Sequence, residues 1–153
     1  MCIRDRNNDG LPDIWHTAIE NETFPLFINE GKGLFRNAGQ QSRLANLTRP
    51  MSGWSNGIVD LDNDGWKDLV VARSNVLDNI GEISRHFRYA EPNSVFRNLG
   101  NGQFEDVSAA AGADFKRPAP VSYTHLDVYK RQGRSFVPTP DADRPVDRRG
   151  RSR

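Results

Sequence analysis

Short apolar runs separated by polar turns make up much of residues 7–119. The runs at 57–59 and 69–72 flank an acidic loop and are too short for helices, so we predict that both are β-strands. Two other segments, 27–37 and 96–106, share the pattern F-x-N-x-G-x-G-x-F-x-[DN]. Apolar arms around a glycine-rich turn predict a β-hairpin in each, and Asn101-Gly102 is a favoured turn dipeptide.

An acidic loop followed by a hairpin occurs twice, so the chain contains an internal repeat. Asp13 and Asp68, which hold the same position in the two loops, lie 55 residues apart. Repeats of this length are typical of propellers and similar arrays, whose units cannot bury their faces alone. We therefore predict an all-β fold, a partial β-propeller of about two blades, with repeats at about 7–40 and 52–112. Two blades leave side faces and sheet edges open, so low stability in isolation is expected.

The acidic loop at 60–68 has the composition of a calcium site. Carboxylates occupy its first, third, fifth and ninth positions, and Gly65 at the sixth position permits a sharp turn. The Trp66 carbonyl could add a backbone ligand, and the last carboxylate could close the shell with both oxygens. An EF-hand would need a Glu at the twelfth position, where Val71 stands, and helices on both sides. We predict a calcium loop between strands, with the side-chain ligands Asp60, Asp62, Asp64 and Asp68.

Residues 7–13 repeat this loop, with Gly10 aligned on Gly65. Asn7, Asp9 and Asp13 match the third, fifth and ninth positions, and Asp5 stands at the first. A second calcium site is predicted here.

The two ends of the chain have an unusual relation at the level of DNA. One DNA string can encode Met1–Arg6. The same string, read with a one-base shift, can encode residues 127–132, and its reverse complement can encode residues 121–126. The string resembles a transposon-end adaptor used in sequencing libraries; the alternative is chance similarity. We interpret residues 1–6 and 120–132 as adaptor-derived, which places Asp5 outside the native sequence. Residues 133–153 are expected to be disordered and foreign.

Charge divides along the same boundaries. The chain carries +1 overall, but residues 7–119 hold 11 Lys+Arg against 15 Asp+Glu, while residues 120–153 hold 8 against 4. The basic tail could be read as a nucleic-acid arm or as read-through sequence, and we favour the second reading. Cys2 is the only cysteine, which excludes a disulfide framework, and no apolar run is long enough to span a membrane.

Three further features each have two readings. The segment 77–92, inserted between the second loop and its hairpin, could contact a ligand or form a solvated surface loop. Trp15, Trp54 and Trp66 could form a sugar-stacking platform or pack between blades. His16 and His86 lack the neighbours of a metal or catalytic site and are expected to be packed or exposed.

Residues 109–112 predict a short turn of helix stopped by glycine.

Loop, strand and hairpin together resemble the FG-GAP/VCBS repeats of integrin-like β-propellers. The hairpin sequence N-S-V-F-R-N-L-G-N-G-Q-F-E-D-V-S-A-A-A-G and the upstream Gly53-Trp54 are similar to bacterial secreted proteins related to cartilage acidic protein, which often carry an ASPIC/UnbV-type domain. The resemblance implies Ca²⁺ ligation by the predicted residues of both loops, including the carbonyls of Leu11 and Trp66.

The resemblance favours a non-catalytic, calcium-stabilised module of a secreted, periplasmic or cell-surface protein. Its partner would be an unidentified protein or carbohydrate, in adhesion or ligand binding. The alternative is the propeller portion of an extracytoplasmic hydrolase or oxidoreductase whose catalytic residues lie elsewhere. Residues 7–119 contain no G-x-S-x-G box or paired histidines, so we expect no catalysis within them. Nucleic-acid binding would rest on the basic tail alone.

Overall fold

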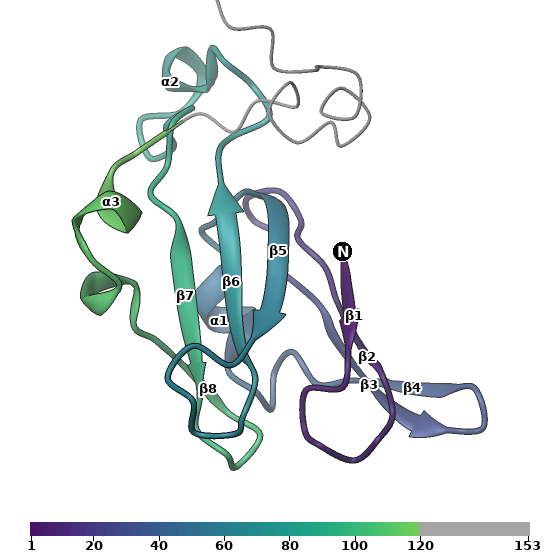
Figure 1. The fold of residues 1–153 in the computed structure, drawn as a ribbon. Helices are drawn as coiled ribbons and strands as arrows, with labels where there is room; N and C mark the ends of the chain where they lie inside the picture. Colours follow the sequence, from purple (N-terminus) through teal and green to yellow (C-terminus); the bar gives the residue numbers. More distant parts are fainter. Residues whose placement is uncertain (120–153) are drawn as a thin grey trace, which may run out of the picture. The chain divides into compact units, whose positions relative to one another are not determined.

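The computed structural model of the chain describes residues 1–119 and contains two four-stranded antiparallel sheets (Figure 1). In each sheet the strands lie side by side in chain order, as in a propeller blade, so the all-β prediction is confirmed. The predictions for residues 120–153, including the adaptor-derived segment and the basic arm, lie outside the described residues. The first sheet comprises β1 (Cys2–Arg4), β2 (Asp13–Trp15), β3 (Leu26–Gly31) and β4 (Leu34–Asn37). The second comprises β5 (Gly53–Val59), β6 (Asp68–Arg73), β7 (Ser94–Asn98) and β8 (Phe104–Asp106).

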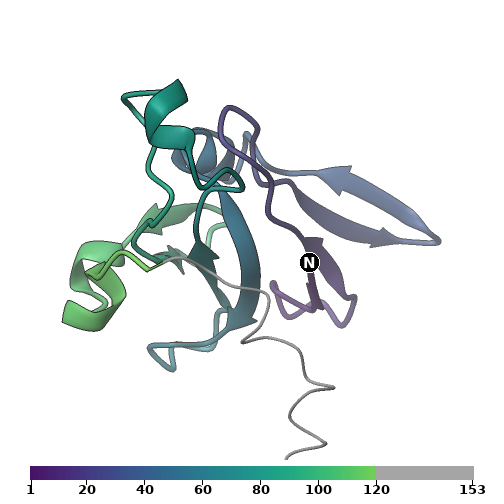
Figure 2. The same cartoon turned by 90° about the horizontal axis from the view of Figure 1, so that it is seen from above.

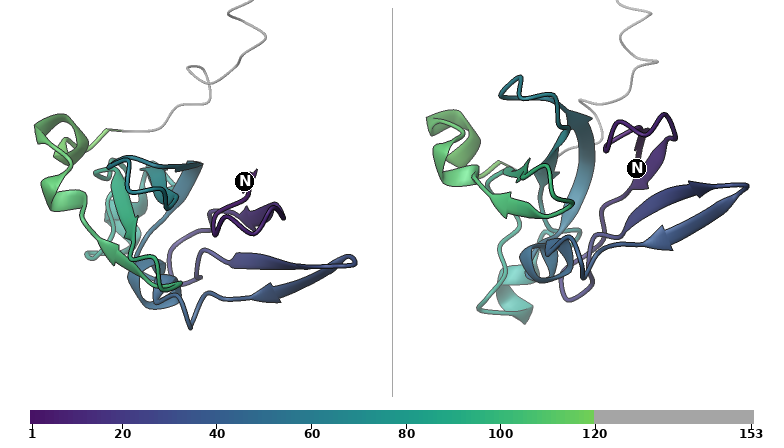
Figure 3. Two further views of the ribbon diagram at one scale, coloured as in Figure 1. Left: turned by 60° about the horizontal axis from the view of Figure 1, so that its bottom comes forward. Right: turned by 90° about the horizontal axis from the view of Figure 1, so that it is seen from below.

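Both predicted hairpins are present. The first turn, between β3 and β4, holds Lys32 and Gly33 at φ 54° and 78°. The second, between β7 and β8, contains Asn101-Gly102 and is closed by the Leu99 amide donating to the Gln103 carbonyl at 3.0 Å. The β3–β4 hairpin projects away from the second sheet (Figures 2 and 3).

Within residues 1–119 the helices are short connecting pieces. The segment 40–51, which has no clean period, contains α1 (Leu44–Thr48). Its Thr48 hydroxyl donates to the Leu44 carbonyl at 2.8 Å and accepts the Phe24 amide at 2.9 Å, which ties the helix to the first repeat. The insertion holds α2 (Ile80–Ile83). After β8 come the 3₁₀ helix η1 (Ser108–Ala110) and α3 (Ala113–Lys116), separated by Gly112 at φ 102°, as the predicted glycine stop requires.

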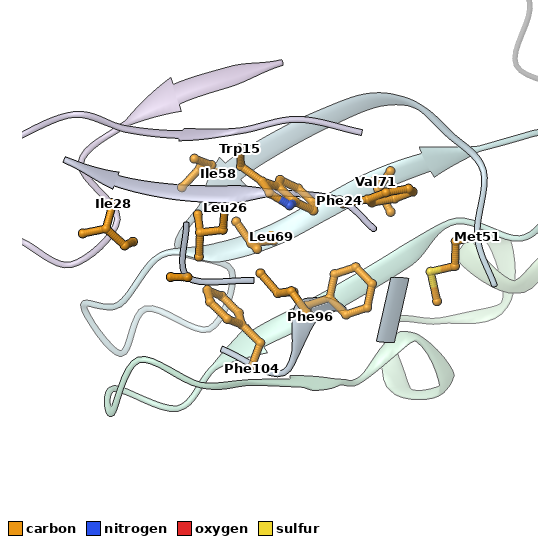
Figure 4. Close-up of a cluster of buried hydrophobic side chains, with 12 residues drawn as sticks. Trp15, Phe24, Leu26, Ile28, Met51, Ile58, Leu69, Val71, Phe96 and Phe104 are labelled. Carbon is orange, nitrogen blue, oxygen red and sulfur yellow. The ribbon is translucent and has the colours of Figure 1, made fainter. Parts of the chain in front are cut away.

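The core lies where the inner face of the first sheet packs on the second (Figure 4). The Trp15 indole is fully buried, 6.5 Å from the Phe24 ring and 6.4 Å edge-on from the Phe96 ring of the second sheet. Burial of such aromatic groups contributes on the order of 1.5–3 kcal/mol each. Of the two readings for Trp15, packing between blades is the one that the structure shows. The cluster contains Trp15, Phe24, Leu26, Ile28, Ala38, Leu44, Met51, Ile58, Leu69, Val71, Phe96 and Phe104.

Gly53 allows the two repeats to approach closely at the start of β5. A Cβ atom at this position would lie 2.7 Å from Thr17 Cγ2 and 2.8 Å from the Phe24 ring. The Gly53 amide donates to the Ala18 carbonyl at 3.0 Å. A larger residue would therefore push the second sheet away from the first.

Candidate metal centre

The two acidic loops, loop 1 (residues 5–13) and loop 2 (residues 60–68), have the same backbone conformation. Each joins the first strand of its sheet to the second. The fourth position is an Asn in the left-handed region, Asn8 at φ 61° and Asn63 at φ 60°. The sixth is Gly10 at φ 82° or Gly65 at φ 89°. Asn and Gly are the residues that enter this region at least cost, so the sequence itself favours the turn.

Side chains close each loop on its own backbone. The Gly65 amide donates to Asp60 Oδ2 at 3.1 Å, and the Gly10 amide donates to Asp5 Oδ2 at 2.9 Å. The fifth-position carboxylates Asp64 and Asp9 each accept the amide two residues later, from Trp66 and Leu11, at 2.8 Å. These bonds fix the turn and set the directions of the remaining oxygens. Whether the Leu11 and Trp66 carbonyls are ligands stays a prediction.

The ninth-position carboxylates Asp13 and Asp68 are buried and anchor each loop to the third strand of its sheet. Asp68 Oδ1 accepts the Asn98 amide at 2.9 Å, and its Oδ2 accepts the Leu61 amide at 3.0 Å. In loop 1, Asp13 Oδ1 accepts the Asn29 backbone amide at 2.9 Å, and its Oδ2 accepts the Arg6 backbone amide at 3.4 Å. Both oxygens of each carboxylate therefore already accept one hydrogen bond. Each oxygen keeps a second lone pair for another partner.

Asn29 and Asn98 support the loops in a way that the sequence analysis missed. The Asn98 side-chain amide donates to the Lys67 carbonyl at 3.0 Å, and that of Asn29 donates to the Pro12 carbonyl at 3.1 Å. Their Oδ1 atoms accept amides of the hairpin turn. The sequence held one signal for this role. The Asn of the F-x-N hairpin pattern occurs in both repeats, together with the loop that it supports.

Loop 2 brings three of its four predicted side-chain ligands together. Oxygens of Asp60, Asp62 and Asp68 all lie within 4.8 Å of one another. Asp64 is outside this group; its Oδ1 accepts the Trp66 amide. The Lys67 ammonium lies 3.8 Å from Asp60 Oδ2 and offsets part of the negative charge. Within residues 1–119 no other three His, Cys, Asp or Glu side chains come this close together.

Several buried oxygens at the predicted ligand positions have no hydrogen-bond donor. They are Oδ1 of Asp60 in loop 2 and Oδ1 of both Asp5 and Asn7 in loop 1. An acceptor removed from water without a partner is costly, and a hard cation would satisfy oxygens of this kind. In loop 1 the Asn7 side chain donates to Asp9 Oδ2 at 2.8 Å, which leaves its oxygen uncommitted. The converging carboxylates of loop 2 therefore fit a hard cation such as calcium, whereas the three carboxylates of loop 1 do not converge in this way.

Arg6 distinguishes loop 1 from loop 2, where Leu61 holds the same position. Its guanidinium is buried, with Nε 3.6 Å from Asp13 Oδ2 and the Cζ atom 5.6 Å from the centre of the Phe104 ring. Burial raises the pKa of Asp13 and lowers the pKa of Arg6. The Asn29 amide and the Arg6 charge act in the opposite direction on the pKa of Asp13. The sequence offered no sign of this contact, because Phe104 belongs to the second repeat.

The two loops touch. The Asn8 side-chain amide donates to the Gly65 carbonyl at 2.8 Å. Asn8 belongs to loop 1 and Gly65 is the turn residue of loop 2, so each loop constrains the other.

His16 and the base of the insertion 77–92 are both held by contacts within the fold, and whether the insertion contacts a ligand stays a prediction. The His16 ring stacks on Phe27 with centroids 6.1 Å apart, and its Nδ1 lies 3.2 Å from the Thr17 carbonyl oxygen. The insertion is anchored at its base, where Arg73 pairs with Glu91 at 2.5 Å and the Ser74 hydroxyl donates to the Tyr89 carbonyl at 2.7 Å. Burial raises the pKa of the Glu91 carboxyl, and the Arg73 charge opposes this.

No helix among residues 1–119 is long and apolar enough to cross a membrane. No curated protein matches the chain. Residues 5–71 match the family described as the FG-GAP-like repeat. The match starts at Asp5 and includes loop 1, strands β2 to β5 and loop 2, so it does not support a foreign origin for Asp5 and Arg6. Residues 5–71 are thus similar to an FG-GAP-like repeat, and the strands of each sheet follow one another in a propeller-like order.

Proposed function

We propose that this chain is a non-catalytic, calcium-stabilised β-propeller repeat module of an extracytoplasmic protein that serves adhesion or ligand binding. The observation that carries the proposal is the repeated loop, whose donor-less buried oxygens stand at ligand positions. Asp60, Asp62 and Asp68 would hold the ion in loop 2, with Asp64 and the Trp66 carbonyl completing the shell. In loop 1 the ligands would be Asp5, Asn7, Asp9, the Leu11 carbonyl and Asp13.

Calcium in these loops would act as a structural support. Extracellular calcium modules have dissociation constants of ~10⁻⁴–10⁻³ M. At a free calcium concentration ten times the dissociation constant, one site adds ~1.4 kcal/mol to the free energy of unfolding. Such sites would be filled outside the cell and nearly empty in a low-calcium cytosol, which supports an extracytoplasmic location. A relation to ASPIC/UnbV-type proteins is part of the same proposal.

Isothermal titration calorimetry on chelator-treated protein tests the calcium sites. Calcium is expected to bind at two sites, magnesium more weakly, and Asp60→Asn/Asp62→Asn should abolish the site in loop 2 while loop 1 still binds. Asp78→Asn, at an exposed position in the insertion, is the matched control and should bind as the wild type does. Absence of heat at millimolar calcium, or equal binding by the Asp60/Asp62 double variant, would overturn the assignment.

The same protein separates a binding module from an enzyme. Calcium should slow the digestion of the protein by a protease. The protein itself should not hydrolyse any member of a panel of generic hydrolase substrates. Turnover by the purified chain, abolished by substitution of residues within 1–119, would contradict the non-catalytic proposal.

A further inference from the structure

The sequence contains two Asn-Gly dipeptides, Asn56-Gly57 and Asn101-Gly102, and the fold places them in different surroundings. In such a pair the backbone nitrogen of the glycine can attack the side-chain amide carbon of the asparagine. Glycine hinders this attack least, because it has no Cβ atom and its backbone is the most adaptable. The two pairs have the same local chemistry, so a difference in their reactivity has to come from the fold.

Asn56-Gly57 is held inside strand β5. Asn56 pairs with Val71 of β6, and Gly57 pairs with Val70, so the ladder keeps both backbones extended. The Asn56 side-chain amide donates to the Trp15 carbonyl at 3.2 Å, and both residues of the pair are half-buried. Attack on Asn56 therefore requires this part of the strand to open first.

Asn101-Gly102 lies in the turn between β7 and β8, where the glycine nitrogen is unrestrained. Both residues are exposed, and a Cβ atom built on Gly102 would meet no other atom within 4 Å. Within residues 1–119 the Gly102 amide donates to no acceptor. The nitrogen can therefore approach the Asn101 side chain without breaking a hydrogen bond of the fold.

A hydrogen bond prepares the Asn101 side chain for the attack. Its Oδ1 accepts the Gln103 amide at 3.0 Å, which folds the side chain back along the turn and draws electron density from Cγ. When a nitrogen adds to Cγ, negative charge develops on this oxygen. A donor that already points at the oxygen stabilises that charge and lowers the barrier.

We propose that Asn101 is a self-modification site, at which the folded chain converts asparagine into aspartate and isoaspartate. The Gly102 nitrogen forms a bond to Asn101 Cγ, the bond from Cγ to Nδ2 breaks, and ammonia leaves with the proton of the Gly102 amide. Water then opens the resulting succinimide ring. Attack of water at Cγ gives aspartate, and attack at the main-chain carbonyl gives isoaspartate. No redox partner is needed, and the reaction does not depend on calcium binding.

The isoaspartate product changes a turn that contacts loop 2. Its main chain runs through the side-chain carbons and is one methylene longer. The Trp66 indole lies against this turn, since a Cβ atom on Gly100 would be 3.0 Å from Trp66 Nε1. The Asn98 side-chain amide at the base of the turn donates to the Lys67 carbonyl at 3.0 Å. The longer turn is therefore expected to hold loop 2 less well and to lower the stability of the second sheet.

Incubation of the folded chain in neutral buffer, followed by mass spectrometry of its peptides, tests the proposal. The peptide with Asn101 should gain the mass of an amide-to-acid exchange and become a substrate for an isoaspartyl methyltransferase, used as the probe. Asn56 in the same sample is the internal control. It should convert at least about tenfold more slowly, which corresponds to an opening free energy of ~1.4 kcal/mol for β5. In urea the two sites should convert at similar rates, because their local sequences are the same.

Two variants complete the test. Asn101→Gln, whose longer side chain cannot form the same ring, should remove the methyltransferase signal from the folded chain. Asn101→Asp carries the charge of the product on an unaltered main chain, so the converted protein should unfold at a lower urea concentration than this variant. Equal conversion of Asn56 and Asn101 in the folded chain, or conversion of Asn101 only in urea, would overturn the proposal. Equal unfolding of the converted protein and Asn101→Asp would overturn the link to loop 2.

Discussion

Loop 1 and loop 2 share a backbone but differ in the charges that they hold. Loop 1 carries three Asp and one Arg, a net charge of −2, and loop 2 carries four Asp and one Lys, a net charge of −3. In loop 1 the positive charge is the Arg6 guanidinium, buried against Asp13. In loop 2 it is the Lys67 ammonium near Asp60 at the loop surface. The backbone hydrogen bonds set the shape of both loops, whereas the side chains decide how strongly each attracts a cation. Loop 2 is therefore expected to bind calcium more tightly.

The largest difference between the loops is expected at the ninth position. Asp68→Asn leaves the amide of either Leu61 or Asn98 without an acceptor, a cost of ~1–3 kcal/mol. Asp13→Asn does the same in loop 1 and also leaves Arg6 buried without its carboxylate. The free energy of unfolding should therefore fall by ~3–5 kcal/mol in this variant. Urea unfolding in the presence of a chelator measures both.

Arg6→Leu provides the control, because it gives loop 1 the residue that loop 2 has at this position. In that background the losses caused by Asp13→Asn and Asp68→Asn should become equal. An Asp13→Asn loss that is the same with and without Arg6 would show that the ion pair contributes nothing.

The residue at the third position of each loop is expected to decide which loop binds calcium more tightly. Asp62→Asn gives loop 2 the amide of loop 1 and should weaken its calcium binding about tenfold, ~1.4 kcal/mol. Asn7→Asp is the reverse change and should strengthen loop 1 by a similar factor. Calorimetry on the variant with both changes should show the order of the two sites exchanged. An unchanged order would mean that the third position does not contact the ion.

The contact between the loops predicts a smaller effect. Asn8→Gly keeps the left-handed backbone but removes the donor to the Gly65 carbonyl, so calcium binding to loop 2 should weaken by ~0.5–1.5 kcal/mol. Asn63→Gly is the matched control, with the same φ and no such bond across to loop 1. Equal shifts in the two variants, measured by calorimetry, would show that the loops bind independently.

The smallest effect is expected at Lys67. Its ammonium and the Asp60 carboxylate are both partly exposed, so their attraction is worth only ~0.5 kcal/mol. Lys67→Met should therefore raise the calcium affinity of loop 2 roughly two- to threefold at low salt. The gain should shrink at high salt, where exposed charges are screened. Pro12 holds this position in loop 1, so binding there should not change. A weaker loop 2 in this variant would contradict the assignment.

Much of the fold followed from short-range patterns. Asn101-Gly102 and the paired aromatic arms predicted the second hairpin, because turn chemistry and strand alternation act over a few residues. The helix α1 could not be predicted, since five residues are too few for a period. It is held by Thr48 and the buried Leu44. The assignment of ligands was limited in the same way: spacing indicated four carboxylates in loop 2, but it could not show that only Asp60, Asp62 and Asp68 converge.

By itself the sequence determined the shape of each loop, because every bond that closes the turn joins residues less than ten positions apart and Asn and Gly supply the left-handed conformations. The same was true of the two hairpins within 27–37 and 96–106. Only the tertiary structure decided which face of each sheet is buried. The rows Ile14–Phe27 and Leu69–Phe96 are alike in pattern and register, yet only the second is covered by a neighbouring sheet. Burial depends on what packs against a surface, and that is not written in the surface's own residues.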